Sequence, residues 1–412
     1  MLPRAFFLSL LLTPCAAAQE FSTAAMRSVS LPEVYSLALG RSEDLARQAE
    51  GVAQLDAAAA QISASFRPVV DLNAALTKDQ GRAGASRGYL SGRYNLFSGM
   101  RDYVSLKAAS AKTASARLDL ERARQRLYLS AAEAYLDLLA AQREVFIRAE
   151  QAGVTSRRIA ELEARAAIGR SRRSEVVSAR SQLAQDKAAS LAALSGERLA
   201  QQALKFMTGL ASDLAPRETE LRPRSGLEDY LRLALARPDV QARKAEADAY
   251  GLLAEAQDRG AWPSVDLAAN YYVLRDPMPQ PENRWDAGAF LRVPLYAGGE
   301  LRAKKDSAYA ARRDRQLALD LARRQALSDV RSAHDEYEYA VRRAESLAEA
   351  LELASENARY QQEDYKMGLV NNLDVLNALN TAAQTGLALS QAQARRSLAL
   401  IRLETAAGAE LK

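Results

Sequence analysis

Apolar and polar residues follow one order of predicted elements, and that order occurs twice along the chain. Each copy opens with a helical stretch rich in Ala, Leu and Arg, which ends at a proline. Two short segments in which apolar and polar residues alternate come next. A very long helical stretch and a return helix follow, separated by a glycine. The opening helix is expected over residues 31–66 in the first copy and 227–259 in the second. The very long helix is expected over residues 101–167 and 301–367.

The two copies keep nearly the same spacing over their whole length. Pro68 and Pro263 are 195 positions apart, and Gly169 and Gly368 are 199 positions apart. A nearly constant offset of this size is the signature of an internal duplication. The sequence therefore predicts a leader and two tandem repeats, with the boundaries 1–18, 19–215 and 216–412.

The long helical stretches are inconsistent with a compact monomeric globule. They contain no proline, and a helix of about 65 residues is roughly 98 Å long at 1.5 Å per residue. Ordinary globular helices have only three or four turns. The apolar positions are mostly alanine, which lets neighbouring helices approach closely. We therefore expect the helices to lie side by side in an extended, coiled-coil-like wall.

The alternating segments form two predicted β-hairpins, at about residues 68–98 and 263–297. Each strand has about ten residues with a period of two, the length that a tilted membrane strand requires. Two soluble hairpins packed on the helices are the alternative. The residues expected to face lipid include Leu72, Tyr94, Leu267, Leu291 and Val293.

If the predicted strands cross a membrane, several copies of the chain must assemble, because each copy supplies only four strands. Four strands are too few to close a membrane barrel, and the backbone edges of an open sheet would meet lipid. Three copies would supply about twelve strands, an even number that can close. A membrane role therefore requires a homotrimer.

The N-terminal segment has the order of a secretory signal peptide. Arg4 precedes an apolar run that is too short to span a bilayer as a helix, and residues 16–18 are all alanine. Cleavage after Ala18 would remove Cys15, the only cysteine. A lipoprotein acceptor is the alternative role of Cys15, although a small residue normally precedes a lipid-modified cysteine and Pro14 stands there. We expect removal of Cys15, an export route into the periplasm and a mature chain without disulfides.

Charge and composition do not favour nucleic-acid binding or catalysis. The formal net charge is +5, but basic residues alternate with acidic ones along the predicted helices. His334, the only histidine, lies in the middle of a predicted helix without an evident catalytic partner. The sequence has no phosphate-binding glycine loop, and no cofactor or metal site is expected. We therefore do not expect an enzyme.

Several motifs carry a resemblance to one family, and the resemblance covers essentially the whole chain after the leader. The motifs are Leu31-Pro32-Glu33, Tyr94-Asn95-Leu96-Phe97-Ser98-Gly99, Val293-Pro294-Leu295-Tyr296-Ala297-Gly298-Gly299 and the paired segments around Gly169 and Gly368. By these motifs and by the order in which they occur, the chain resembles the TolC-like outer membrane efflux proteins. The resemblance implies a mainly α fold with a small β part. It further implies a trimer with a 12-stranded outer-membrane β-barrel and a 12-helix periplasmic α-barrel.

The resemblance also implies partners and a gate at the helical tips. The partners are a periplasmic adaptor and an inner-membrane pump of the RND or ABC type, besides outer-membrane lipid. In the family's best-known member a tyrosine, an arginine and acidic residues close the tunnel. Tyr365 matches the tyrosine, whereas Val370 stands where that member has its arginine. The other gate positions are Glu175, Asp374 and Asn377, and the expected adaptor contacts are Gly169, Arg170, Arg172, Arg173, Gly368 and Leu369.

Each tip has residues suited to a tight turn between helices. A glycine permits the turn, and we expect Ser174 in the first tip and Asn372 or Asp374 in the second to cap the returning helix. The basic first tip is either a solvated helix end or a docking surface for an acidic adaptor. We also expect a ring of Asp374 carboxylates to narrow the pore and attract cations.

These features predict a passive conduit that crosses the outer membrane and extends into the periplasm. It would carry drugs, metal ions or exported polypeptide, as in efflux or type I secretion, and a partner would power it. The alternative is a periplasmic coiled-coil adaptor or structural protein. Such a protein would share the leader and the long helices but not two amphipathic hairpins at an equal offset. The substrate and the class of pump stay open.

Overall fold

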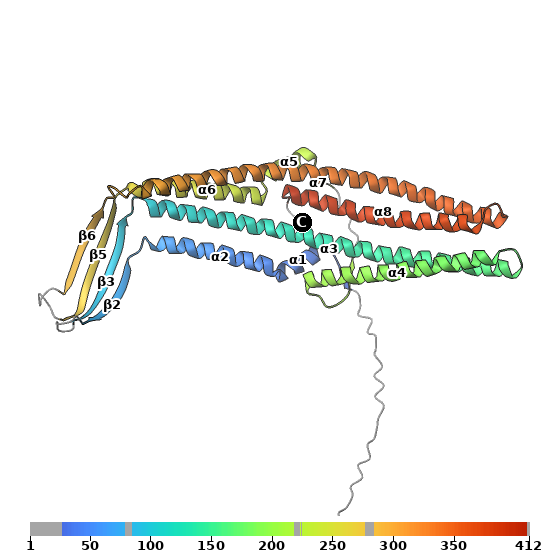
Figure 1. Ribbon diagram of the computed structural model, residues 1–412, viewed down its shortest axis with the longest axis horizontal. Coiled ribbons are helices and arrows are strands. Elements are labelled where there is room, and N and C mark those ends of the chain that lie inside the picture. Colours follow the sequence, from blue (N-terminus) through green and yellow to red (C-terminus); the bar gives the residue numbers. More distant parts are fainter. Residues whose placement is uncertain (1–26, 79–84, 218–222, 224, 277–283, 410–412) are drawn as a thin grey trace, which may run out of the picture.

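The protein is an elongated wall of helices with a small sheet at one end (Figure 1). The computed structural model describes residues 27–78, 85–217, 223, 225–276 and 284–409. The elements of the first repeat are β1 (Arg27–Val29), α1 (Leu31–Arg41), α2 (Glu43–Ala64), β2 (Val69–Thr77), β3 (Ala85–Phe97), α3 (Arg101–Ala167), α4 (Arg173–Thr208) and β4 (Leu214–Pro216). Those of the second are α5 (Leu227–Leu235), α6 (Pro238–Asp258), a 3-10 turn (Arg259–Ala261), β5 (Ser264–Asp276), β6 (Trp285–Arg292), α7 (Glu300–Met367) and α8 (Asn372–Ala407).

The long helices occupy the predicted stretches. Helix α3 has 67 residues and α7 has 68, which at 1.5 Å per residue makes each about 100 Å long. Their return helices α4 and α8 have 36 residues each. Gly209 and Gly408 end the return helices with a positive φ, a conformation that glycine adopts without strain. The predicted fold class, long helices with a small β part, is confirmed.

The opening helix of each repeat is broken in two, and the prediction of single helices over 31–66 and 227–259 is wrong in this respect. The first break is at Ser42, whose side chain accepts a hydrogen bond from the Leu45 N–H and so starts α2. The second break precedes Pro238, because proline disfavours the α conformation in the residue before it. The breaks lie 196 positions apart, at equivalent places in the repeats.

A parallel pair of three-residue strands, β1 and β4, was not predicted from the sequence. It ties the start of the described chain to the segment that follows α4. The buried Tyr135 of α3 supports the pair, since its hydroxyl donates to the Arg217 carbonyl at 2.6 Å. A cluster of buried apolar residues packs around it, including Val29, Val34, Leu138 and Leu214.

The four strands at the other end form one antiparallel sheet in the order β2-β3-β5-β6. The hairpins of the two repeats are joined through β3 and β5, where Tyr94 pairs with Leu267. Strands β2 and β6 each have a partner on one side only, so the sheet has two open edges. An open edge exposes unpaired backbone groups that another strand can satisfy.

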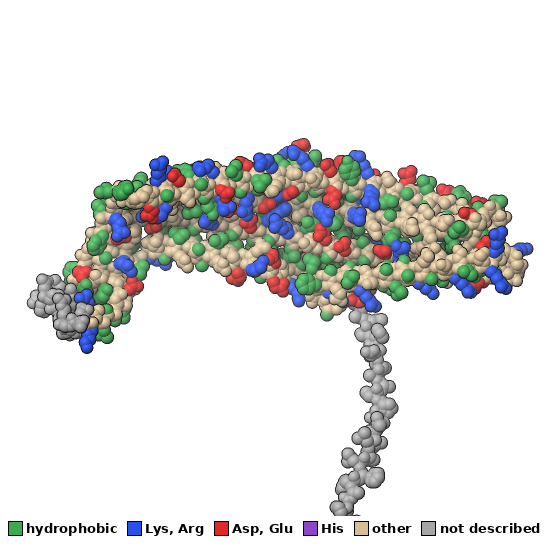
Figure 2. Space-filling model, in the orientation of Figure 1, with side chains coloured by type: hydrophobic (Ala, Val, Ile, Leu, Met, Phe, Trp, Pro, Cys, Tyr) green, Lys and Arg blue, Asp and Glu red, His purple; other side chains and the backbone are tan. Residues whose placement is uncertain are grey.

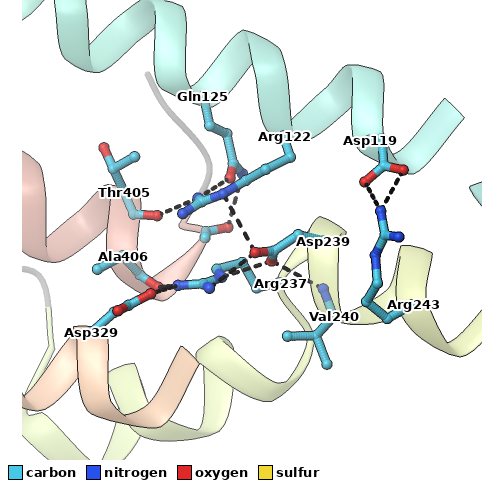
Figure 3. A network of polar contacts seen from close by, with 11 residues as sticks. Asp119, Arg122, Gln125, Arg237, Asp239, Val240, Arg243, Asp329, Thr405 and Ala406 are labelled. Carbon is cyan, nitrogen blue, oxygen red and sulfur yellow. Dashed lines mark hydrogen bonds and ion pairs between the residues drawn. The ribbon is translucent and has the colours of Figure 1, made fainter. Parts of the chain in front are cut away.

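A partly buried ionic network joins residues of the two repeats (Figure 3). Arg237, 4% exposed, donates to both oxygens of Asp239 and to the Asp329 carboxylate of α7. Its guanidinium also donates to the Ala406 carbonyl at 2.9 Å, and Arg122 donates to the Thr405 carbonyl at 2.7 Å. Two arginines, one from each repeat, thus satisfy carbonyls at the end of α8.

The pKa of Arg122 reflects its burial and the charged side chains around it. Burial and the neighbouring Arg237 cation lower the pKa of Arg122 to about 10, against the opposing effect of Asp239. The Arg122 side chain therefore stays charged at neutral pH. In the first repeat, side-chain atoms of Arg41 similarly lie close to Gly209 at the end of α4.

Some sequence predictions fall outside the described residues. These are the leader (1–18) with Cys15, and most of the loops at 78–86 and 275–283 that join the paired strands. Among the residues that the structure describes, no helix is both long enough and apolar enough to cross a membrane.

Candidate functional site

The sheet is amphipathic across all four strands. One face carries polar side chains that bond across the strands: Asn73 donates to Ser91, Asn95 to Asp266 and Asn270 to Asp286, each at 2.8 Å. Asp71 and Arg93 add an ion pair at 3.4 Å. Cross-strand pairs of this kind stabilise the sheet, and the polar face that they form is suited to contact with water.

The opposite face of the sheet is apolar and lies open. One cross-strand row consists of Leu72, Leu90, Tyr271 and Trp285, which are 75%, 41%, 48% and 69% exposed. Tyr94 and Leu267 pair directly in another row. A contiguous exposed apolar surface of this kind indicates a face that meets lipid or another protein.

The predicted lipid-facing residues fall into two groups. Leu72, Tyr94, Leu267 and Leu291 all lie in strands, on this apolar face. Val293 lies beyond the end of β6 at Arg292, so its assignment to a strand is wrong. The reason is Pro294, which disfavours a continued ladder.

The first helical tip lies between α3 and α4 at the end of the molecule far from the sheet. Gly169 turns the chain with a φ of 75°. Helix α4 begins at Arg173, and its N-terminal flanking residue is Arg172, which makes no side-chain cap. The prediction that Ser174 caps this helix is therefore wrong. Arg170, Arg172 and Arg173 are all exposed, and Lys and Arg side chains gather at this end of the molecule (Figure 2).

In the second tip, which joins α7 and α8, side chains hydrogen-bond the start of the return helix. Gly368 has a φ of 83° and is followed by the exposed Leu369. Asn371 caps α8, because its side chain accepts from the Leu373 and Asp374 N–H groups. The Asp374 carboxylate accepts in return from the Asn371 N–H at 3.2 Å, which completes a capping box. The cap is thus Asn371 and not Asn372 or Asp374 alone.

The predicted gate residues are only partly brought together. Tyr365 is 6% exposed, and its hydroxyl donates to the Glu175 carboxylate of α4 at 3.3 Å. Asn377 is exposed on α8. Val370 packs at the margin of an apolar cluster that includes Ile159, Leu162, Val375 and Leu376. The position expected from the resemblance to hold an arginine is therefore part of a small hydrophobic core.

Arg158 of α3 is a site residue that the sequence did not reveal. Its side chain is 6% exposed, and its guanidinium stacks on the Tyr365 ring at 3.9 Å. Its Nε donates to the side chain of the buried Asn372 at 3.0 Å. Arg165 also lies over the same ring, at 4.9 Å. The two tips are therefore held together inside one chain by a stacked and hydrogen-bonded arginine.

The structure places Asp374 in a capping box, whereas a pore charge is what the sequence leads us to expect of it, and a pair of variants separates the two roles. We predict that Asp374→Asn lowers the cation preference of the pore, because it removes one carboxylate per chain. It also weakens the capping box, as does Asn371→Ala, at a cost of about 1 kcal/mol. Ion selectivity should be measured from reversal potentials in planar bilayers. An equal shift in Asn371→Ala would assign the effect to the cap and contradict a pore charge.

The comparisons with known proteins agree with this architecture. The profile of the family described as "Outer membrane efflux protein" matches residues 230–409. The outer membrane efflux protein BepC of Brucella suis biovar 1 (strain 1330) is 24% identical over 308 residues. The match spans 72% of this chain and 66% of that protein, just under two thirds of its length.

The same arrangement of elements occurs in solved outer-membrane channels. CusC superposes with a TM-score of 0.84 at 17% identity, over 92% of both chains. VceC of Vibrio cholerae gives 0.81 at 20% identity, over 93% of this chain and 97% of that one. The MtrE channel of Neisseria gonorrhoeae gives 0.80 at 20% identity, over 93% and 89%.

The duplicated helices, the joined hairpins and the helical tips are thus shared over nearly the whole length with these channels, and the second repeat matches the family profile directly. The described chain therefore has the fold of these solved proteins, and residues 230–409 of its second repeat resemble the outer membrane efflux proteins.

Proposed function

We propose that this protein is a passive outer-membrane conduit that works as a homotrimer. The observation that carries the proposal is the four-stranded sheet, with one bonded polar face, one exposed apolar face and two open edges. Edge-to-edge closure of three copies would satisfy the edges, turn the apolar face to lipid and enclose the polar face. The helices would continue the passage into the periplasm as a tunnel.

The conduit has no energy source of its own in this proposal. An inner-membrane pump of the RND or ABC type would drive transport, and a periplasmic adaptor would connect the pump to the helical tips. The arrangement serves efflux or type I secretion, and the partner decides between drugs, metal ions and polypeptides. A coiled-coil adaptor or structural role has less support, because the amphipathic sheet would then expose its apolar face to water.

Reconstitution of the full-length protein tests the proposed function. Purified from outer membranes in detergent, the wild type should be a trimer by light scattering, and it should conduct ions in planar bilayers. A water-soluble monomer without conductance would overturn the proposal.

The tips offer a prediction about the adaptor. Replacing Arg170, Arg172 and Arg173 with Gln should weaken capture of an acidic adaptor roughly tenfold at low salt, because rim charges mainly speed encounter. Affinity should be measured by pull-down or biosensor at two salt concentrations. The control replaces Arg312, Arg313 and Arg323 of α7, which lie far from the tip. Unchanged capture by the tip variant would show that the first tip is only a solvated helix end.

A further inference from the structure

A cavity of about 270 Å³ lies where α3 and α4 meet α8. Helices α3 and α8 run side by side toward the tips in this part of the molecule (Figure 1). Thr155 and Leu376 of the cavity lining are three and four residues from Arg158 and Asn372, which is about one helical turn. Packed helices leave few hollows of this size, so the cavity is a candidate binding site.

Most of the cavity wall is apolar and comes from both repeats. Phe146 of α3 is 68% exposed, whereas Leu376 of α8 is 4% exposed. The cavity therefore has an aromatic ring on its solvent side and buried aliphatic carbon on the other. Its large apolar side chains are Phe146, Ile147, Val154, Leu376 and Leu379. A wall of this kind binds the apolar part of a small molecule.

A buried carboxylate lies directly behind the polar part of the lining. Asp186 of α4 is 4% exposed and forms no ion pair among the described residues. Its carboxylate accepts from the Thr155 hydroxyl at 2.6 Å. It also accepts from the side-chain amides of Gln151 and Gln182, each at 3.0 Å. The three donors line the cavity and are all neutral, so no cation compensates the buried negative charge.

The directions of these hydrogen bonds leave free acceptors on the lining. An ionised carboxylate only accepts, so Gln151 and Gln182 must both turn their amide nitrogens toward Asp186. The Gln151 nitrogen also donates to the side-chain oxygen of Asn380 of α8 at 2.7 Å. The side-chain oxygens of Gln151 and Gln182 accept no hydrogen bond from the described part of the chain. The polar part of the cavity therefore suits a ligand that donates hydrogen bonds.

The charge of the cavity is negative. Among the described residues that line it, Glu150 is the only charged one, and its side chain is exposed. Together with Asp186 behind the lining, it disfavours an anionic ligand. No group of three or more His, Cys, Asp or Glu side chains in the described ranges could hold a metal ion. A cation with an apolar body matches both the charge and the wall.

We propose that this cavity binds amphipathic organic cations. An aromatic or alkyl body lies against the apolar wall, and an ammonium group donates to the free oxygens of Gln151 and Gln182. The charge of Asp186 behind them favours the cation over a neutral ligand of the same shape. A volume of about 270 Å³ suits a ligand with one ring and a short chain. Because α3 and α8 both line the cavity, an occupied cavity stabilises the state in which the two helices pack together.

A series of ligands with one body and different head groups tests the selectivity. Phenylbutylamine, phenylbutanol and phenylbutyrate are cationic, neutral and anionic at neutral pH, with the head group at the far end of the chain. Equilibrium dialysis of the full-length protein, with the same detergent concentration on both sides, gives each Kd. The amine should bind roughly tenfold more tightly than the alcohol, and the carboxylate least tightly. Equal affinities of amine and alcohol, or no binding of the amine, would overturn the proposal.

Variants place the ligand in the cavity. Asp186→Asn keeps the shape but removes the charge, so it should weaken the amine roughly tenfold and leave the alcohol unchanged. The matched control is Asp119→Asn, which removes a carboxylate of α3 that lies 32 residues from Gln151, roughly 48 Å along the helix. Ala383→Phe fills the cavity and should abolish binding of both ligands. Unchanged amine affinity in either Asp186→Asn or Ala383→Phe would overturn the site.

The effect on the channel rests on the proposed function and is measured in planar bilayers. If the amine binds only the state with packed tips, three times its Kd lowers the ratio of open to closed channels about fourfold. Asp186→Asn should lose this effect at the same amine concentration. An open probability that stays unchanged while the amine binds would overturn the coupling of the cavity to the tips. A wild type that binds the amine in dialysis but does not conduct would instead overturn the proposed function and leave the binding site intact.

Discussion

Arginine in place of Leu267 is expected to prevent assembly of the protein in the membrane. Leu267 lies on the apolar face of β5, opposite Tyr94 of β3 and Ala289 of β6. If that face meets lipid, a charged side chain on it costs up to about 2–4 kcal/mol per chain, with the largest cost at the bilayer midplane. The cost is incurred three times in a trimer, which is comparable to the whole stability of a typical domain.

The yield of heat-resistant trimer in the outer membrane measures this effect. It should fall at least a hundredfold for Leu267→Arg, while the chain is still made and exported. The matched control is Asn270→Arg, three residues along the same strand on the polar face. There the new guanidinium lies opposite Asp286 and can pair with it. Normal trimer from Leu267→Arg, or equal loss in both variants, would contradict the assignment of the apolar face to lipid.

The parts of the fold that the sequence predicted are those with local physical signals. The bounds of α3 agree with the predicted stretch because a glycine with positive φ marks each end, at Gly99 and Gly169, and no proline intervenes. The alternation in β2 and β5 is equally local. It separates the bonded polar face from the apolar face without any knowledge of which strands pair.

The missed features depend on contacts between residues far apart in the chain. Strands β1 and β4 have three residues each, too few for a period, and they pair over nearly 190 positions. Arg158 is one of many basic residues at helical spacing, and its partner Asn372 is 214 positions away. The break at Ser42 had a local signal, a serine that can cap a helix, but the surrounding helical pattern masked it.

The position of Arg158 changes the prediction for the gate. The resemblance places the gate cation at residue 370, which is valine here, and the structure puts a buried guanidinium on the Tyr365 ring from another helix. The Arg158 guanidinium also pairs with Glu161 of the same helix at 3.0 Å, whereas its Nη2 atom has no hydrogen-bond partner among the described residues. The ion pair with Glu161, the bond to Asn372 and the stacking on Tyr365 together offset the cost of desolvating this cation.

Arg158→Ala is expected to favour separation of the two tips and opening of the periplasmic end. A desolvated cation–π contact contributes about 2 kcal/mol. The unsatisfied Asn372 acceptor adds about 1–3 kcal/mol. Together they amount to about 3–5 kcal/mol, or roughly a 150- to 5,000-fold change in the ratio of open to closed tips. Open probability in planar bilayers is the direct measurement, and hydrogen exchange at residues 360–375 reports the loosening in the same protein.

Two control variants distinguish an effect of the charge and hydrogen bonds of Arg158 from an effect of its side-chain volume. Arg180→Ala removes an exposed ion pair with Glu163 in the same hairpin, which is worth at most about 1 kcal/mol, and should leave the open probability unchanged. Arg158→Met keeps most of the apolar volume but loses the donor and the charge, so it should open the channel nearly as much as Arg158→Ala. A closed Arg158→Met channel would mean that the side chain acts through volume alone. The in-chain contact between the tips would then have to be held by the apolar cluster around Val375 and Leu376.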